Sequence, residues 1–117
     1  MNKFFIYHNP RCSKSRETLE ILKNAGVEPE VIEYLKTPPT ETELRELIRA
    51  LKLKPSQVVR QKEPVFEELA LDLMDDDAVI QALLLHPILL ERPIVFSEGR
   101  AVLGRPPEKV REAFFKN

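Results

Sequence analysis

The chain has 117 residues, of which 43% are hydrophobic and 32% charged, so we expect one globular domain over residues 1–117. Its formal net charge of -1 gives no basic surface for nucleic-acid binding, and no apolar stretch is long enough for a secretory signal or a membrane span. One cysteine and two histidines cannot build a structural zinc site or an internal disulfide, so we expect a cytoplasmic protein that binds no metal, nucleic acid or membrane.

The first third of the chain predicts a strand, a helix and a second strand. Residues 4–7 are aromatic and apolar throughout, which is typical of a central strand buried on both faces. From Ser13 the apolar residues recur at helical spacing until Gly26, which stands where a C-terminal capping glycine belongs. A second strand is expected over residues 31–35, and a connection of this length implies parallel pairing with a right-handed crossover.

The middle of the chain, about residues 40–86, is predicted to be a helical insertion. Thr40 and Glu43 have the spacing of a capping box, which opens a helix with a buried apolar stripe. Further helical pieces are expected at residues 56–60, at residues 65–69 and from residue 75 onward.

The last third predicts an antiparallel hairpin and a final helix. Residues 94–96 and 101–103 are apolar and flank a polar turn that contains Gly99. Pro106 and Pro107 then introduce the helix, because proline is tolerated in a first helical turn. The order βαβ, helical insertion, ββα predicts an α/β domain with a thioredoxin-like mixed sheet.

Cys12 lies between the first strand and the first helix, which places its thiol at a helix N-terminus. Free N–H groups and the helix dipole lower the pKa of a thiol there, and Arg11, Lys14 and Arg16 add positive charge. The alternative is a buried structural cysteine, but such a residue normally lies in an apolar run. We therefore predict a thiolate nucleophile, and with no second cysteine its redox cycle needs an external thiol.

The chain around Cys12 resembles the active-site segment of the glutaredoxin-coupled arsenate reductases, through the run HNPRCSKSRETL at residues 8–19. Later blocks around Arg60, Arg92 and Arg105 match the same family in order and spacing, so the resemblance covers nearly the whole chain. It implies a thioredoxin-like fold, arsenate as the oxyanion substrate, and glutathione and glutaredoxin as external reductants, with no bound cofactor.

The resemblance also implies roles for individual residues. Cys12 attacks the arsenic of arsenate, and three arginines, Arg60, Arg92 and Arg105, bind the oxyanion and the thiol adduct. Guanidinium groups suit these roles because they offer paired donors to a tetrahedral anion and stabilise a thiolate. Arg92 precedes Pro93, and the resemblance implies that this peptide bond is cis.

Two polar neighbours of Cys12 have roles that the sequence leaves open. His8 either acts electrostatically on the thiol, if the loop folds back, or is a loop histidine without a role. Ser15 stands in a Cys-x-x-Ser arrangement, where its hydroxyl either bonds the Cys12 sulfur or caps the first helical turn. His86, beside Pro87, is expected to cap a helix C-terminus.

Other classes of function compete with this interpretation. Cysteine phosphatases need Cys-x5-Arg, and Thr18 at that position excludes them. Spx-type regulators bind RNA polymerase and commonly use a Cys-x-x-Cys switch, which Ser15 removes; a regulator without that switch leaves the arginines unexplained. A glutathione-dependent thiol reductase with another substrate stays open. We therefore expect an oxidoreductase that reduces arsenate to arsenite through a covalent arseno-cysteine, with the last two classes as alternatives.

Overall fold

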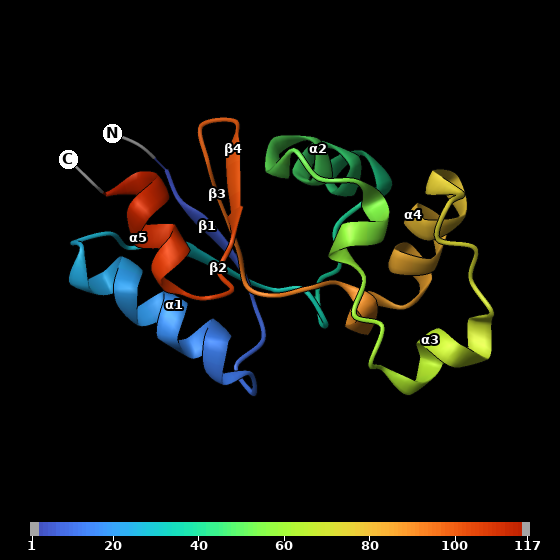
Figure 1. Ribbon diagram of the computed structural model, residues 1–117. Helices are drawn as coiled ribbons and strands as arrows, with labels where there is room; N and C mark the ends of the chain where they lie inside the picture. The colour runs from blue at the N-terminus through green and yellow to red at the C-terminus, as the bar shows by residue number, and fades with distance from the viewer. Residues whose placement is uncertain (1–2, 116–117) are drawn as a thin grey trace. The chain divides into compact units, whose positions relative to one another are not determined.

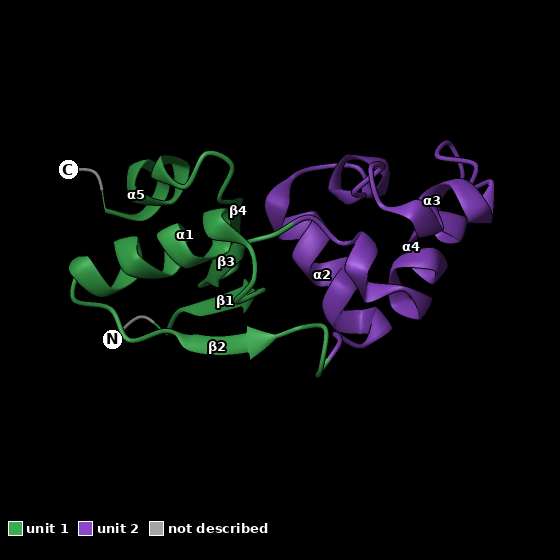
Figure 2. Ribbon diagram, turned by 90° about the horizontal axis from the view of Figure 1, so that it is seen from below, with its two compact units in different colours: residues 1–37, 92–117 green, residues 38–91 purple. Residues whose placement is uncertain are grey.

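The computed structural model describes residues 3–115, which form two compact units (Figures 1 and 2). The first unit, green in Figure 2, consists of residues 3–37 and 92–115, and the second, purple, of residues 38–91. The second unit corresponds to the helical insertion that the sequence predicts at about residues 40–86. Within residues 3–115, every helix is too short or too polar to cross a lipid bilayer.

A four-stranded mixed sheet forms the centre of the first unit, with the strand order β2-β1-β3-β4. β1 (Phe5–His8) pairs in parallel with β2 (Glu30–Glu33) and antiparallel with β3 (Ile94–Ser97). β4 (Arg100–Leu103) pairs antiparallel with β3. The βαβ and ββα order confirms the thioredoxin-like α/β fold and the central place of the first strand.

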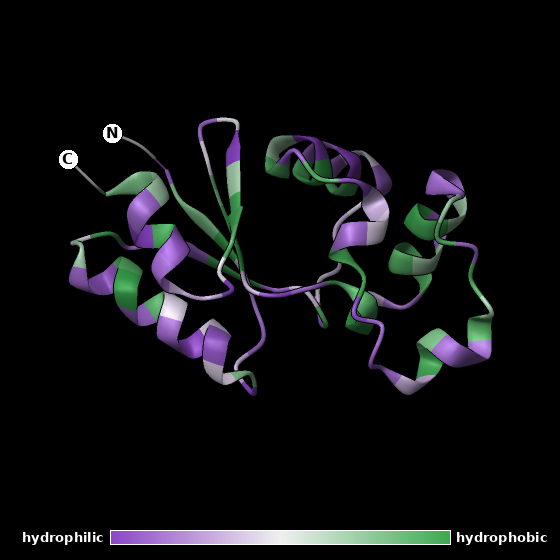
Figure 3. Ribbon diagram, in the orientation of Figure 1, coloured by the Kyte–Doolittle hydropathy of each residue, from purple (hydrophilic) through white to green (hydrophobic). Residues whose placement is uncertain are grey.

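Two helices, α1 (Ser13–Asn24) and α5 (Glu108–Phe114), contact each other and lie along one face of this sheet (Figure 1). Ile6 and Val95 are partners on the neighbouring strands β1 and β3, so their side chains share a face. Hydrophobic residues run along the strands in Figure 3. The core cluster of buried side chains consists of Phe4, Ile6, Leu22, Val95 and Val110.

Two strand predictions need correction. Phe5 and Tyr7 are only half-buried, so β1 alternates in burial and is not buried on both faces. The second strand ends at Glu33, two residues earlier than predicted. The chain turns there because the N–H groups of Lys36 and Thr37 both donate to the Glu33 carbonyl oxygen, at 2.9 and 3.0 Å. Local turn formation thus overrides the strand preference of the apolar residues that follow.

The hairpin and the last helix are confirmed. Glu98 and Gly99 have φ values of 50° and 76°, the left-handed pair that a tight two-residue hairpin turn requires. Glycine reaches this conformation without the steric cost that a side chain brings. α5 begins directly after the Pro106–Pro107 pair, as predicted.

The second unit is helical, as predicted, and its main helices begin at side-chain caps. In the capping box of α2 (Glu41–Leu51), the Glu43 N–H donates to Thr40 Oγ1 at 3.2 Å, and the Thr40 N–H donates to Glu43 Oε1 at 2.9 Å. α4 (Asp76–Leu85) is capped by Asp75, whose carboxylate accepts from the Ala78 N–H. The remaining helical pieces are α3 (Pro64–Leu69) and two 3-10 turns, Pro55–Val58 and Pro87–Leu89.

One predicted helical piece, residues 56–60, is shorter than expected. Val59 is extended and forms an isolated antiparallel bridge with Leu90, and the Arg60 N–H donates to the Leu89 carbonyl oxygen at 2.7 Å. Pairing with a distant segment therefore ends the turn after Val58. His86 occupies the C-cap of α4, which confirms the capping position predicted for it.

Candidate active site

Cys12 is the N-cap residue of α1, as the sequence predicts. Its N–H donates to the Asn9 carbonyl oxygen at 3.0 Å, and its own carbonyl accepts from the Arg16 N–H at 3.0 Å. The residue is partly exposed, and it is a free cysteine. The loop therefore closes on itself just before the helix, with the thiol beside the first helical N–H groups.

Arg92 and Arg105, distant in sequence, both lie beside this thiol. Arg105 Nη2 is 3.7 Å from Cys12 Sγ, and Arg105 Nε donates to the Arg92 carbonyl oxygen at 2.7 Å. The Arg92 guanidinium acts on the thiol both as a hydrogen-bond donor and as a positive charge. The first unit thus brings together three of the residues that the sequence proposed for the site.

Two donors of Arg92 stand out among the described residues. Its Nε and Nη1 atoms are buried and have no hydrogen-bond partner within residues 3–115. A buried charged donor without a partner is costly, so such groups are normally satisfied by protein, water or a ligand. A planar guanidinium offers parallel N–H groups, a geometry that fits two oxygens of one oxyanion.

The pKa of the Cys12 thiol is lowered by a balance of opposing effects. Burial, the largest effect, raises the pKa. Hydrogen bonds from the backbone N–H groups of Ser15 and Lys14, with the donor and the charge of Arg92, lower it and together outweigh burial. The geometry therefore favours the thiolate, the form that attacks an electrophile.

The Ser15 hydroxyl bonds to His8 and to the backbone of Asn9. The sequence had offered two other roles for it, a bond to the Cys12 sulfur or a cap on the first turn of α1. Its Oγ lies 2.5 Å from His8 Nδ1 and accepts from the Asn9 N–H at 3.0 Å. Burial lowers the pKa of His8, partly offset by Glu33, so the imidazole is neutral near pH 7. His8 therefore joins the thiol loop through a hydrogen bond and does not place a positive charge there.

Asn9 is a buried residue of this loop that the sequence analysis did not single out. Its side-chain Oδ1 accepts from the Arg11 N–H at 3.0 Å, while its backbone groups bond to Cys12 and Ser15. An asparagine before a proline is a known signal for this type of turn, and it was present in the sequence.

Both arginines beside the thiol precede a cis proline, since the peptide bonds Arg92–Pro93 and Arg105–Pro106 are cis. The implication for Pro93 is thus confirmed, whereas the second cis bond was not anticipated. The Gly104 N–H donates to the Pro93 carbonyl oxygen at 2.9 Å. This hydrogen bond joins the segment that carries Arg92 to the segment that carries Arg105.

Arg60, the third arginine of the predicted set, belongs to the second unit. Its side chain is 20% exposed, and its guanidinium forms ion pairs with Glu63 at 3.3 Å and Glu91 at 3.4 Å. Its role toward an oxyanion stays a prediction.

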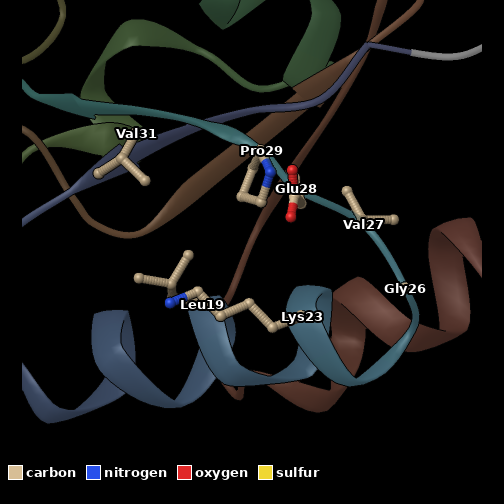
Figure 4. A pocket seen from close by; sticks show the side chains of 7 residues that line it. All are labelled: Leu19, Lys23, Gly26, Val27, Glu28, Pro29 and Val31. Carbon is tan, nitrogen blue, oxygen red and sulfur yellow. The ribbon is translucent and has the colours of Figure 1, made fainter.

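A surface hollow of about 480 Å³ lies elsewhere in the first unit, between the C-terminal half of α1 and the start of β2 (Figure 4). It contains none of the site residues predicted from the sequence. The lining residues of the hollow are Leu19, Lys23, Gly26, Val27, Glu28, Pro29 and Val31.

Within residues 3–115, no three His, Cys, Asp or Glu side chains cluster as metal ligands do.

Residues 7–113 match the model of the ArsC family, which covers most of the chain. The chain belongs to the ArsC family. Its relatives include the arsenate reductase of Escherichia coli strain K12, which is 45% identical over 114 residues, covering 96% of this chain and 81% of that protein.

Two further proteins are similar to this chain over nearly its whole length. An uncharacterized protein of Escherichia coli strain K12, YfgD, is 52% identical over 110 residues and covers 92% of each chain. The solved structure of an arsenate reductase from Vibrio cholerae is 49% identical, covers 94% of this chain and 96% of that one, and superposes with a TM-score of 0.88.

Proposed function

We propose that this protein is an oxidoreductase that reduces arsenate to arsenite, with glutathione and glutaredoxin as electron donors. The observation that carries the proposal is the pair of buried Arg92 donors that have no partner within residues 3–115, beside a thiol of lowered pKa. Such a site suits a tetrahedral anion that a thiolate attacks. The substrate is further supported by the relatives named arsenate reductase, at 45% and 49% identity.

The first step is binding of the oxyanion beside the thiolate. Bringing two negative groups together is unfavourable, and the guanidinium groups of Arg92 and Arg105 offset that repulsion. Cys12 Sγ then forms a bond to arsenic, and one arsenate oxygen leaves as water after protonation. The product is an arseno-cysteine whose remaining oxygens stay on the arginines.

Reduction requires two electrons, and the chain has no second cysteine to supply them. A glutathione thiol attacks the arsenic of the arseno-cysteine, and a second oxygen leaves as water, so that arsenic carries both sulfurs. A glutaredoxin thiolate then attacks the glutathione sulfur, and the bond between that sulfur and arsenic breaks. The electron pair of the broken bond stays on arsenic and reduces it from As(V) to As(III). Water then cleaves the bond between Cys12 Sγ and arsenic, which releases arsenite and returns Cys12 as a thiol. The two external thiols are oxidised to one glutathione–glutaredoxin disulfide, so the cycle requires no bound cofactor.

We further propose that Arg60 binds the oxyanion. This assignment is supported by the family resemblance at Val59–Arg60 and by the geometry of the guanidinium group, whose fork matches two arsenate oxygens.

The test is arsenite production from arsenate by the purified protein with glutathione, glutaredoxin and a glutathione-recycling system. We expect turnover that requires every component and that disappears in Cys12→Ser, because a serine hydroxyl is not ionised at neutral pH. Ser13→Ala, an exposed neighbour, is the matched control and should keep its activity. Absence of turnover in the wild-type protein, or turnover that survives in Cys12→Ser, would contradict the proposal.

A further inference from the structure

Gly104 is a buried residue that joins the end of β4 to Arg105, and its backbone passes unusually close to α1. A Cβ atom at this position would lie 2.7 Å from Thr18 Oγ1 and 2.9 Å from Pro93 Cγ. Both distances are far below van der Waals contact. The segment therefore reaches its observed place only because residue 104 has no side chain.

Neither neighbour can move aside easily. Thr18 is fully buried in α1, and its Oγ1 donates to the Lys14 carbonyl oxygen at 2.9 Å, which fixes its rotamer. Pro93 has a closed ring, is buried, and accepts the Gly104 N–H through its carbonyl oxygen. A side chain at residue 104 would therefore move backbone segments apart.

These contacts connect the three parts of the thiol site. Thr18 belongs to the helix that begins at Cys12, Pro93 follows Arg92, and Arg105 follows Gly104. The contact between Arg105 Nη2 and Cys12 Sγ is already 3.7 Å long, so a shift of a few tenths of an ångström weakens it.

We propose that Gly104 is a positioning residue of the active site: its missing side chain sets how closely Arg92 and Arg105 approach Cys12, and so how tightly the oxyanion binds. The statement about the oxyanion rests on the proposed function, whereas the statement about the thiol does not. Because Gly104 touches no reacting atom, it acts only through these three residues.

The experiment compares Gly104→Ala with the wild-type chain. Because the chain has one cysteine, the pH dependence of alkylation by iodoacetamide reports the pKa of Cys12 alone. We expect a higher pKa in Gly104→Ala and a kcat/KM for arsenate lower by about tenfold, with most of the change in KM. Val110→Ala, in the core of the same unit, is the control for lost stability and should leave the Cys12 pKa unchanged.

A second pair of variants identifies the contact responsible. Thr18→Ala removes two of the three atoms nearest to a Cβ at residue 104, Thr18 Oγ1 and Cγ2, and leaves the third, Pro93 Cγ. Gly104→Ala should therefore raise the Cys12 pKa less in a Thr18→Ala background than in the wild type. If Gly104→Ala alone does not fold, Thr18→Ala and the double variant are compared instead, and a smaller but measurable rise is expected.

The outcomes separate the two proposals. A wild-type Cys12 pKa and KM in folded Gly104→Ala would overturn the positioning role, as would an unchanged pKa between Thr18→Ala and the double variant. A raised pKa in Gly104→Ala, in a protein whose wild type reduces no arsenate, would support the positioning role and reject the proposed function.

Discussion

Arg92 in the first unit and Arg60 in the second unit have opposite electrostatic surroundings. In the first unit, Arg92 has two buried donors with no partner among the described residues. In the second unit, Arg60 faces two carboxylates, Glu63 and Glu91, which already balance its charge. An arginine therefore offers its full positive charge to an anion only where no carboxylate lies close to its guanidinium.

The largest effect is expected from Arg92→Gln, which removes the charge and the fork from the first unit. The Cys12 pKa should rise, because a donor and a positive charge beside the thiolate are lost. We expect kcat/KM for arsenate to fall by about 10² to 10³. The melting temperature should not fall, since the substitution removes two buried donors that have no partner within residues 3–115.

The control for Arg92→Gln is Arg45→Gln, at a partly exposed arginine of the second unit that pairs with Glu41 and Asp77. It should leave both the thiol pKa and the turnover unchanged. An Arg92→Gln protein whose Cys12 thiol keeps the wild-type pKa would contradict the role of Arg92 as the charge that stabilises the thiolate.

A smaller effect is expected from Arg60→Lys. Lysine keeps the charge but loses the bidentate fork, so KM for arsenate should rise while the fold stays intact. The rise should be smaller than the loss in Arg92→Gln, because the carboxylates of Glu63 and Glu91 hold the charge already. Steady-state kinetics measure it, with Arg49→Lys as the control in the same unit. Wild-type rates in Arg60→Lys would count against a binding role.

Thr40→Ala tests how much the capping box of α2 contributes to the stability of the second unit, because it removes that box. We expect a loss of about 1 kcal/mol in the free energy of unfolding, measured with denaturant. Thr37→Ala is the control, because its hydroxyl caps no helix. The Cys12 pKa should stay constant in both variants, and a change there would show that the cap acts on the thiol.

The smallest effect is a pH dependence of stability from His8. Burial lowers its folded pKa below the ordinary value of 6.5, so the unfolded chain binds the proton first as the pH falls. The stability that neutral His8 contributes to the folded chain is fully present above pH 6.5, the ordinary pKa of histidine. It is lost as the pH falls from there through the lower pKa of the folded chain.

Denaturant midpoints between about pH 8 and about pH 5 measure this loss. His8→Asn should flatten the profile, and His86→Asn, which leaves His8 in place, is the control. A profile that is equally steep without His8 would assign the pH dependence to other groups.

Local signals made much of the fold predictable from the sequence. The capping box of α2 and the turn at Gly99 lie within a few residues of the bonds that they form, so their consequences could be stated in advance. The end of β2 could not be predicted, because the turn that bonds to the Glu33 carbonyl competes with a continuing apolar strand pattern. Which of the two wins depends on tertiary context.

The site was predictable only in part. The thiol at the helix N-terminus follows from its neighbours in sequence, but Arg105 and Cys12 are 93 residues apart, and only the family resemblance placed them together. The His8–Ser15 bond spans seven residues, yet the sequence could not show which way either side chain points. The close approach at Gly104 leaves no pattern in a single sequence, since it depends on Thr18 and Pro93.

An arginine-flanked thiolate in the first unit is tested most directly by the rate of Cys12 alkylation as a function of pH, measured with and without arsenate. We expect the thiol to ionise at a lower pH than a free cysteine, and arsenate to slow alkylation by occupying the site beside it. A thiol that ionises like free cysteine and that arsenate does not protect would contradict this expectation.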